Sequence, residues 1–335
     1  MTTNDFLAFA SGASANVLSQ ADYAALSALL ASGFQAGTAQ SAQVNKVWRQ
    51  SSIMAAVLAQ LIVDTTGQNA VDDGTTATLL ANLKAAVSAR SVGVAGASRN
   101  AAMTITTVAS SATFTADEVV VSSALGGLKY CLSGVSASIN LATTGAGGMD
   151  TGTAPATGFV ALYLIYNPAT GAKAMLGWNV TGTPTEIYPG ANMPTGYTAS
   201  SLRGIFLTNA SRQFTPCILR DRDISFAAVN VLSTTTNQST FTSFPVGAVV
   251  APGAVAVNVV SSISNGTANI TMELDVASDA LGSALLVCDG LLPVVGTGRT
   301  ANGWVPIVAT QTLYSRRVSG GGSPTYSVGV IGYRF

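Results

Sequence analysis

Two pairs of aspartates are the nearest that this chain comes to an acid–base site. Asp221 with Asp223 and Asp275 with Asp279 could in principle face one glycosidic bond, which a pair of carboxyl groups can hydrolyse. However, polysaccharide-cleaving β-helices are built from repeats, and this chain has no repeat of fixed period and only 15 acidic residues. Arg220 to Asp223 alternates in charge, so we interpret that segment as an ion-pair ladder at a surface or between subunits.

The sequence also gives little support for nucleophilic catalysis or for a metal site. The chain has no histidine, which removes Ser-His-Asp and Cys-His machinery and histidine metal sites. Cys131, Cys217 and Cys288 are far apart in apolar surroundings, without metal-ligand spacing, and are expected to be buried free thiols. The glycine-rich segments 145–148 and 320–322 lack the Lys-Ser/Thr and helix of a phosphate-binding loop. We therefore expect no enzymatic activity, no cofactor and no metal.

The composition of the chain favours some classes of binding partner and argues against others. Hydrophobic residues make up 48% of the chain and charged residues only 9%, so we expect much of the surface to be buried between subunits. Lys and Arg balance Asp and Glu at 15 each, which gives no electrostatic footprint for nucleic acid or an anionic membrane. The apolar runs 53–63 and 246–260 are too short for a membrane-spanning helix. The first five residues do not have the pattern of a secretory signal, which favours assembly in a cytoplasm.

The first ninety residues carry helix signals and are predicted to form a helical region, 1–90. Ser19 is a good N-cap for a helix that ends at Gly33. A second helix begins near Ser41 and continues without internal Gly or Pro to Gly67, which predicts the longest helix of the protein. A third begins at an Asp73 cap and runs to Val87.

The long helix has apolar residues at heptad spacing, which predicts a seam along which parallel helices of separate chains could pair. The alternative is that this stripe packs against the other two helices of the same chain, because it is shorter than three heptads. The seam residues are Val44, Val47, Ser51, Met54, Leu58 and Leu61.

Beyond this region the pattern changes to β-structure. Residues 91–117 are small and polar and are predicted to be a connector, followed by a central β module over 118–232, a linker over 233–240 and a C-terminal β-sandwich-like domain over 241–335. In the central module we expect one hairpin between residues 158–166 and 172–180, and another between 202–207 and 213–219.

Asn265 and Gly266 suggest the turn of a third hairpin. This pair is favoured in two-residue type I′ turns, and it would set Ile263 opposite Ala268 and Val257 opposite Leu274, with an apolar face on one side. The final segment, TYSVGVIGYRF, is apolar and is predicted to be a strand built into a sheet, so that removing residues 331–335 should make the protein insoluble.

Two segments resemble proteins of one class. In residues 34–87, AGTAQSAQ and NKVWRQ are followed by a small-apolar helix and then by DDG and TATLLANLKAA. This ordered pattern resembles the N-terminal region of tail fibres and related tail proteins of tailed bacteriophages and prophages. The stretches IYNPATGAKAMLGWN and ANMPTGYTASSLRGIFLTNASRQF are similar to the β module that follows it in many such proteins. Together they cover about half of the chain.

The resemblance implies a homotrimer whose N-terminal part joins the tail or baseplate and whose C-terminal part contacts the bacterial surface. Within the matched segment the attachment residues are Asn45, Trp48, Arg49 and Gln50; Trp48 could instead simply pack between the helices.

Residues for receptor contact are not implied by the resemblance. We predict them in loops between the C-terminal strands, where aromatic and Arg or Asn side chains can hold a sugar or a protein patch. The residues are Arg299, Asn302, Trp304, Tyr314, Arg316 and Arg317; the alternative for Trp304 is ordinary core packing.

The expectation is thus a mainly β protein with an N-terminal α-helical region, an elongated homotrimer that serves as a tail fibre in the virion. Its partners would be itself, baseplate or tail proteins, and a pilus, polysaccharide or outer-membrane protein of the host. A baseplate or tail-tip component without receptor contact is the first alternative, and a capsule-degrading tailspike is the second.

Overall fold

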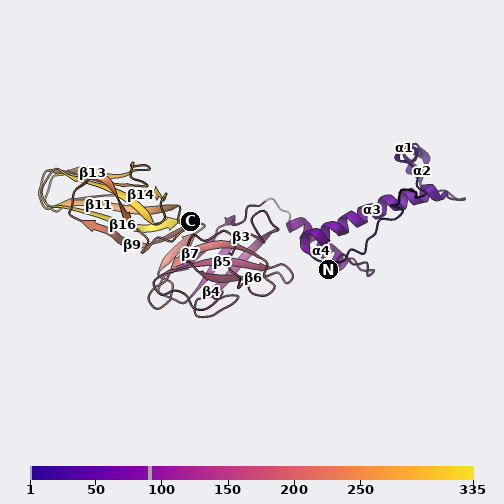
Figure 1. Ribbon diagram of the computed structural model, residues 1–335, viewed down its shortest axis with the longest axis horizontal. Helices are drawn as coiled ribbons and strands as arrows, with labels where there is room; N and C mark the ends of the chain where they lie inside the picture. The colour runs from indigo at the N-terminus through magenta and orange to yellow at the C-terminus, as the bar shows by residue number, and fades with distance from the viewer. Residues whose placement is uncertain (1, 90–92) are drawn as a thin grey trace. The chain divides into compact units, whose positions relative to one another are not determined.

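A computed structural model describes residues 2–89 and 93–335, which form two compact units divided near residue 92 (Figure 1). The first unit is helical and the second is built from antiparallel strands. The expected fold class, mainly antiparallel β-structure with an N-terminal helical region, is therefore confirmed. Within the described ranges, no helix combines the length and the hydropathy needed to cross a membrane.

The described part of the first unit, residues 2–89, has four helices: α1 (Gln20–Ala24), α2 (Ser27–Ser32), α3 (Ser41–Thr66) and α4 (Ala77–Ala89). Ser19 caps α1 by accepting a hydrogen bond from the Asp22 amide, and Gly67 ends α3 in the left-handed conformation that glycine favours. Two expectations are corrected. The segment from Ser19 to Gly33 forms two short helices, and Asp73 bonds Thr75 in a turn instead of capping α4.

An extended N-terminal segment runs antiparallel along α3 and has no counterpart in the sequence-based expectations (Figure 1). We call residues 4–18 the strap. Asn4 Nδ2 donates to Gln60 Oε1 at 3.1 Å, and the Phe9 amide donates to Ser52 Oγ at 2.9 Å. Farther along, Asn45 Nδ2 donates to the Asn16 carbonyl at 2.9 Å. The strap thus fastens to α3 through polar side chains along most of the helix.

The second unit begins with eight strands whose sheet continues into the rest of the unit. β5 and β6 form the expected first hairpin, with Val160 opposite Asn179, and Gly171 in the connecting turn adopts a positive φ. β3 pairs with β4, while β7 lies between β3 and β5. The strands are β1 (Ser98–Arg99), β2 (Ala102–Ile105), β3 (Ser111–Ser122), β4 (Lys129–Asn140), β5 (Phe159–Asn167), β6 (Ala172–Asn179), β7 (Ala199–Leu207) and β8 (Cys217–Arg220).

Two features of this half differ from the expectations. The segment expected as a connector, 91–117, holds β1, β2 and the start of β3, because its small residues alternate between buried and exposed positions in the sheet; residues 91 and 92 lie outside the described ranges. The second expected hairpin forms only next to its turn. The Asn209 amide donates to the Gln213 carbonyl and the Thr215 amide donates to the Leu207 carbonyl, on either side of an antiparallel bridge between Thr208 and Phe214. Beyond these residues β8 leaves β7 and pairs with β2 and β9 (Asp223–Thr234).

The C-terminal half is a sandwich of two sheets. β14, β11, β16 and β9 continue the large sheet in that order, and β10, β15, β12 and β13 form a separate four-stranded sheet. As expected, the last strand, β16, is built into a sheet, between β11 and β9. The expected linker, 233–240, is largely strand. The strands are β9 (Asp223–Thr234), β10 (Gln238–Pro245), β11 (Ala256–Asn265), β12 (Ile270–Ala277), β13 (Leu286–Leu292), β14 (Gly298–Pro306), β15 (Thr312–Ser319) and β16 (Pro324–Arg334).

The predicted hairpin at Asn265 and Gly266 is wrong. β11 and β12 lie in different sheets, and neither turn residue has the positive φ that a type I′ turn requires at both positions. Asn265 instead turns the chain from one sheet to the other: its side-chain oxygen accepts from the amides of Thr267 and Ser323, and its nitrogen donates to the Gly321 carbonyl. The apolar faces predicted for both strands are nevertheless the ones that point into the sandwich.

The three cysteines only partly match the expectation. Cys217 and Cys288 are buried, whereas Cys131 lies exposed on β4, and all three are free thiols. Burial raises the pKa of the Cys217 thiol to about 12. Cys217 is therefore a neutral, apolar-like side chain at ordinary pH.

Candidate functional site

The seam of α3 is largely uncovered. Met54 is 60% exposed and Leu58 is 43% exposed, and Ser51, the seam residue that precedes Met54, is also exposed. Val44, Val47 and Leu61 are half-buried. The buried positions of α3 are other residues, namely Lys46, Ala59, Ile62 and Thr65. The middle of the predicted seam is thus not used in packing against the helices of the same chain.

The strap leaves the seam free. Successive residues of a helix lie about 100° apart around its axis. On that spacing, Asn45, Ser52 and Gln60, which bond the strap, centre on the side of α3 opposite the seam residues. α3 is therefore fastened along a polar side and presents an apolar stripe on the other.

The four predicted attachment residues lie near the start of α3, and two of them hold other parts of the unit. Asn45 bonds the strap, and Gln50 Nε2 donates to Gln20 Oε1 at 3.4 Å. Trp48 meets Phe9 edge to face with ring centroids 5.8 Å apart, but 57% of Trp48 remains exposed. Arg49 is half-buried. Trp48 thus packs against Phe9 of the strap, and the attachment role of its exposed part stays a prediction.

The six residues predicted for receptor contact do not gather in loops. Arg299, Asn302 and Trp304 lie on β14 in the large sheet, and Tyr314, Arg316 and Arg317 lie on β15 in the four-stranded sheet. Because side chains alternate along a strand, each group of three is also divided between two faces. These residues were chosen by residue type, and residue type does not distinguish an exposed position on a strand from one in a loop.

Trp304 belongs to an exposed arrangement on the outer face of the large sheet. Arg334 lies over its ring, with the guanidinium carbon 4.9 Å from the ring centroid. The same guanidinium binds both carboxylate oxygens of Asp223, at 2.6 Å and 2.8 Å. Asn302 is exposed two residues along β14 on the same face as Trp304. The groups of this face that are open to contact are the Asn302 amide and the exposed part of Trp304, while the charge of Arg334 is paired with Asp223.

Arg316 is not available for contact in the same way. Its Nε donates to Asp275 Oδ2 at 2.9 Å, its Nη2 bonds Glu273, and it stacks over Phe241. Burial and the neighbouring Asp275 raise the pKa of Glu273. On the opposite face of β15, Arg317 is half-buried, and its Nε has no hydrogen-bond partner among the described residues.

A buried ionic cluster was missed by the sequence analysis. Arg203 on β7 is 3% exposed, donates to the Gly96 carbonyl at 2.9 Å and lies 3.6 Å from Glu186, which also binds Arg222 at 2.5 Å. Burial lowers the pKa of Arg203 to about 10. These residues are far apart in the sequence and share no spacing that could reveal the cluster.

The carboxylates considered for acid–base chemistry are all engaged within the chain. Asp275 binds Arg316, Asp223 binds Arg334, and Asp221 accepts a hydrogen bond from the Ala101 amide. Asp279 accepts from the amides of Leu281 and Ser283 in a turn. In residues 2–89 and 93–335, no three Cys, Asp or Glu side chains come together in a way that could hold a metal ion. The expected ion-pair ladder at Arg220 to Asp223 is instead a turn between β8 and β9, in which Arg222 binds Glu186 and Asp223 binds Arg334.

Comparisons with known proteins give no family. No protein-family model matches the chain, and no curated protein matches it. A solved structure of a Cry1Da tryptic core variant from Bacillus thuringiensis is 10% identical, with a TM-score of 0.20. The match covers 75% of this chain and 54% of that one, so the chain spans about half the length of the Cry1Da structure. A likeness this weak carries no argument about fold or function.

Proposed function

We propose that this chain is a structural protein of a phage tail, a trimeric tail fibre that attaches the virion to the surface of its bacterial host. The observation that carries the proposal is the exposed stripe on α3, where Met54 and Leu58 lie uncovered at heptad spacing. A row of large apolar side chains in water is costly, and such rows mark interfaces. The resemblance of residues 34–87 to tail-fibre N-termini supplies the class of particle.

Parallel packing of three α3 helices would bury this stripe at a common axis. The N-terminal unit would then serve as the attachment end, with the exposed face of Trp48 available to a baseplate or tail protein. The second unit would be presented in three copies. Three equivalent surfaces convert weak single contacts with a pilus, polysaccharide or outer-membrane protein into long residence, through their effective concentration.

The engaged carboxylates favour attachment over catalysis. A glycosidase needs one carboxyl group free to donate a proton and another free to accept or attack. Asp275 and Asp223 are each bound to an arginine, while Asp221 and Asp279 accept backbone hydrogen bonds. We therefore place a capsule-degrading tailspike behind both structural roles.

The native mass tests the proposal directly. Light scattering of the full chain should give a particle near three times 33.7 kDa. Leu58→Glu places a charge in the seam and should dissociate the particle. Ile53→Glu is the matched control, since Ile53 is 38% exposed on α3 but lies outside the seam. A monomeric wild-type protein, or equal dissociation by both variants, would contradict the trimer.

Cell binding separates the two structural roles. A fibre tip should bind susceptible cells as the isolated protein, and fluorescently labelled protein can be counted on them. A baseplate or tail-tip component without receptor contact would be trimeric or monomeric and would bind no host tested. A halo on a capsulated lawn would instead support the enzyme.

A further inference from the structure

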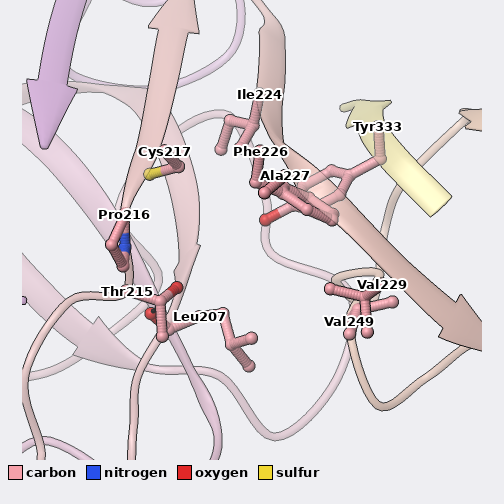
Figure 2. Close-up of a pocket in the computed structure, with 10 residues that line it drawn as sticks. All are labelled: Leu207, Thr215, Pro216, Cys217, Ile224, Phe226, Ala227, Val229, Val249 and Tyr333. Carbon is pink, nitrogen blue, oxygen red and sulfur yellow. Dashed lines mark hydrogen bonds between the residues drawn. The ribbon is translucent and has the colours of Figure 1, made fainter. Parts of the chain in front are cut away.

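A pocket of about 270 Å³ lies within the second unit, where β8, β9 and β16 meet (Figure 2). Cys217, Ile224 and Tyr333 line it and are nearly fully buried. Pro216 and Val229 also line it and are exposed, so the pocket opens to solvent beside them. Figure 2 shows Val229 on one side of the space and the sulfur of Cys217 on another.

An irregularity in the pairing of β9 with β16 explains why the space is not filled. Val229 pairs with Val330 and Ser225 pairs with Gly332, so the three residues from Phe226 to Ala228 stand opposite Ile331 alone. Extra residues on one strand bend it away from its partner and often lie beside functional sites. A Cβ at Gly332 would collide with the carbonyl oxygen of Ile224, so the strands approach closely next to the bulge.

Most polar side chains of the pocket are already hydrogen-bonded within the chain and are not free to bind a ligand. The Tyr333 hydroxyl donates to the Ile205 carbonyl, and Thr215 Oγ1 donates to the Leu207 carbonyl at 3.2 Å. The remaining polar side-chain atom is the Cys217 sulfur, a neutral thiol and a weak donor. An ordered water needs two to four polar partners, so water is held poorly here. No Asp, Glu, Lys or Arg side chain lines the pocket.

We propose that this pocket binds an uncharged, largely hydrocarbon molecule of one or two rings. A cavity of about 150 Å³ lined by apolar side chains accommodates benzene, so the larger space found here suits a bicyclic molecule. A charged ligand is excluded, because nothing in the lining would replace the water that it loses. The inference is independent of the trimer and of the proposed attachment role.

The test uses the full chain and 6-propionyl-2-dimethylaminonaphthalene, an uncharged two-ring probe whose fluorescence moves to shorter wavelength when it leaves water. Wild-type protein should bind it saturably, with one site per chain in the pocket. Val229→Trp places an indole at the mouth and Cys217→Met extends a side chain into the space, so each should weaken this binding at least tenfold. Val318→Trp is the control, since Val318 is 37% exposed and Val229 is 40% exposed, but Val318 lies on β15 away from the pocket.

A second measurement needs no variant. Saturating probe should slow the reaction of Cys217 with N-ethylmaleimide, followed by mass spectrometry, and should leave the exposed Cys131 unaffected. The proposal is overturned if the wild type shows no saturable binding, or if the folded variants bind the probe as wild type does. Equal protection of both cysteines would also overturn it, because the probe would then lie elsewhere.

Discussion

Asp275 is completely buried, and Arg316, directly opposite it on the neighbouring strand, binds its Oδ2 through two nitrogens at 2.9 Å and 2.6 Å. The other carboxylate oxygen, Oδ1, has no hydrogen-bond partner among the described residues. The charge of Asp275 is therefore compensated mainly by one guanidinium. A buried ion pair of this kind makes the fold depend strongly on each partner.

Replacing Arg316 by methionine should destabilise the protein. The change leaves the Asp275 carboxylate buried without a counter-charge, which costs about 3 kcal/mol of unfolding free energy; we take the lower end of the usual range because Arg316 is one-third exposed. Arg299→Met, at an exposed position of β14, should change the value by less than about 0.5 kcal/mol. Urea denaturation measures both. Equal stability of the two variants would contradict a structural role for the pair.

Glu273 should make stability fall as the pH rises through mildly acidic values. Its pKa is raised in the folded protein by burial and by Asp275, so the folded state binds the proton more tightly than the unfolded state does. The resulting stabilisation is complete below the ordinary pKa of glutamate, near 4.5, and is lost as the pH passes the raised folded value. Glu273→Gln should flatten this part of the profile of unfolding free energy against pH. An unchanged profile would assign the dependence to another group.

The long helix was predictable because its signals are local. Ser41 to Thr66 has no internal Gly or Pro, and Gly67 supplies the left-handed stop, so both ends of α3 match the prediction. The strap could not be predicted, since its hydrogen bonds join residues far apart in the sequence, such as Phe9 with Ser52, which are 43 positions apart. The same limit applies to the ionic cluster around Arg203.

Strand pairing shows where pattern analysis fails. Alternation identified which faces of β11 and β12 are buried, because burial depends on each strand alone. It could not identify the partners, since two strands that face each other across a sandwich have the same apolar pattern as two strands of one hairpin. Asn265 was therefore assigned to a turn that its backbone does not form.

Asn265 should be more sensitive to substitution than its role as a turn residue would suggest. Asn265→Ala removes the acceptor for two amides and the donor to Gly321 in a buried position, which should cost about 3 kcal/mol. Asn302→Ala, at an exposed position on β14, is the control and should be nearly neutral. Thermal or urea unfolding provides the comparison. A loss below about 0.5 kcal/mol at Asn265 would show that the crossover does not rely on this side chain.

Deleting residues 331–335 should make the protein insoluble. The deletion removes buried Tyr333 and the pairing of Gly332 with Ser225, and it exposes the edges of β9 and β11. Arg334→Gln keeps the strand and loses only exposed contacts, the ion pair with Asp223 and the stacking on Trp304, so that variant should remain soluble. Sedimentation of cell lysates distinguishes the two. A soluble truncated protein of native size would contradict the central role of β16.

Less of the candidate site than of the fold could be predicted. Heptad spacing located the exposed stripe of α3, because helix geometry maps spacing directly onto a face. The contact residues on β14 and β15 were chosen by residue type, which says nothing about neighbours. Arg316 and Arg317 are adjacent in sequence, yet one binds two carboxylates and the other lies on the opposite face.

The position of β16 between β9 and β11 also bears on how the chain folds as it is synthesised. Both neighbours leave the ribosome first, and each has an unpaired edge until residues 324–334 emerge. At about 5 to 20 residues per second, the stretch between the end of β11 and the start of β16 takes roughly 3 to 12 s to translate. During that interval the nascent sandwich has two open edges, and neighbouring chains on one messenger RNA could pair there, so slower translation or crowded polysomes should favour aggregation.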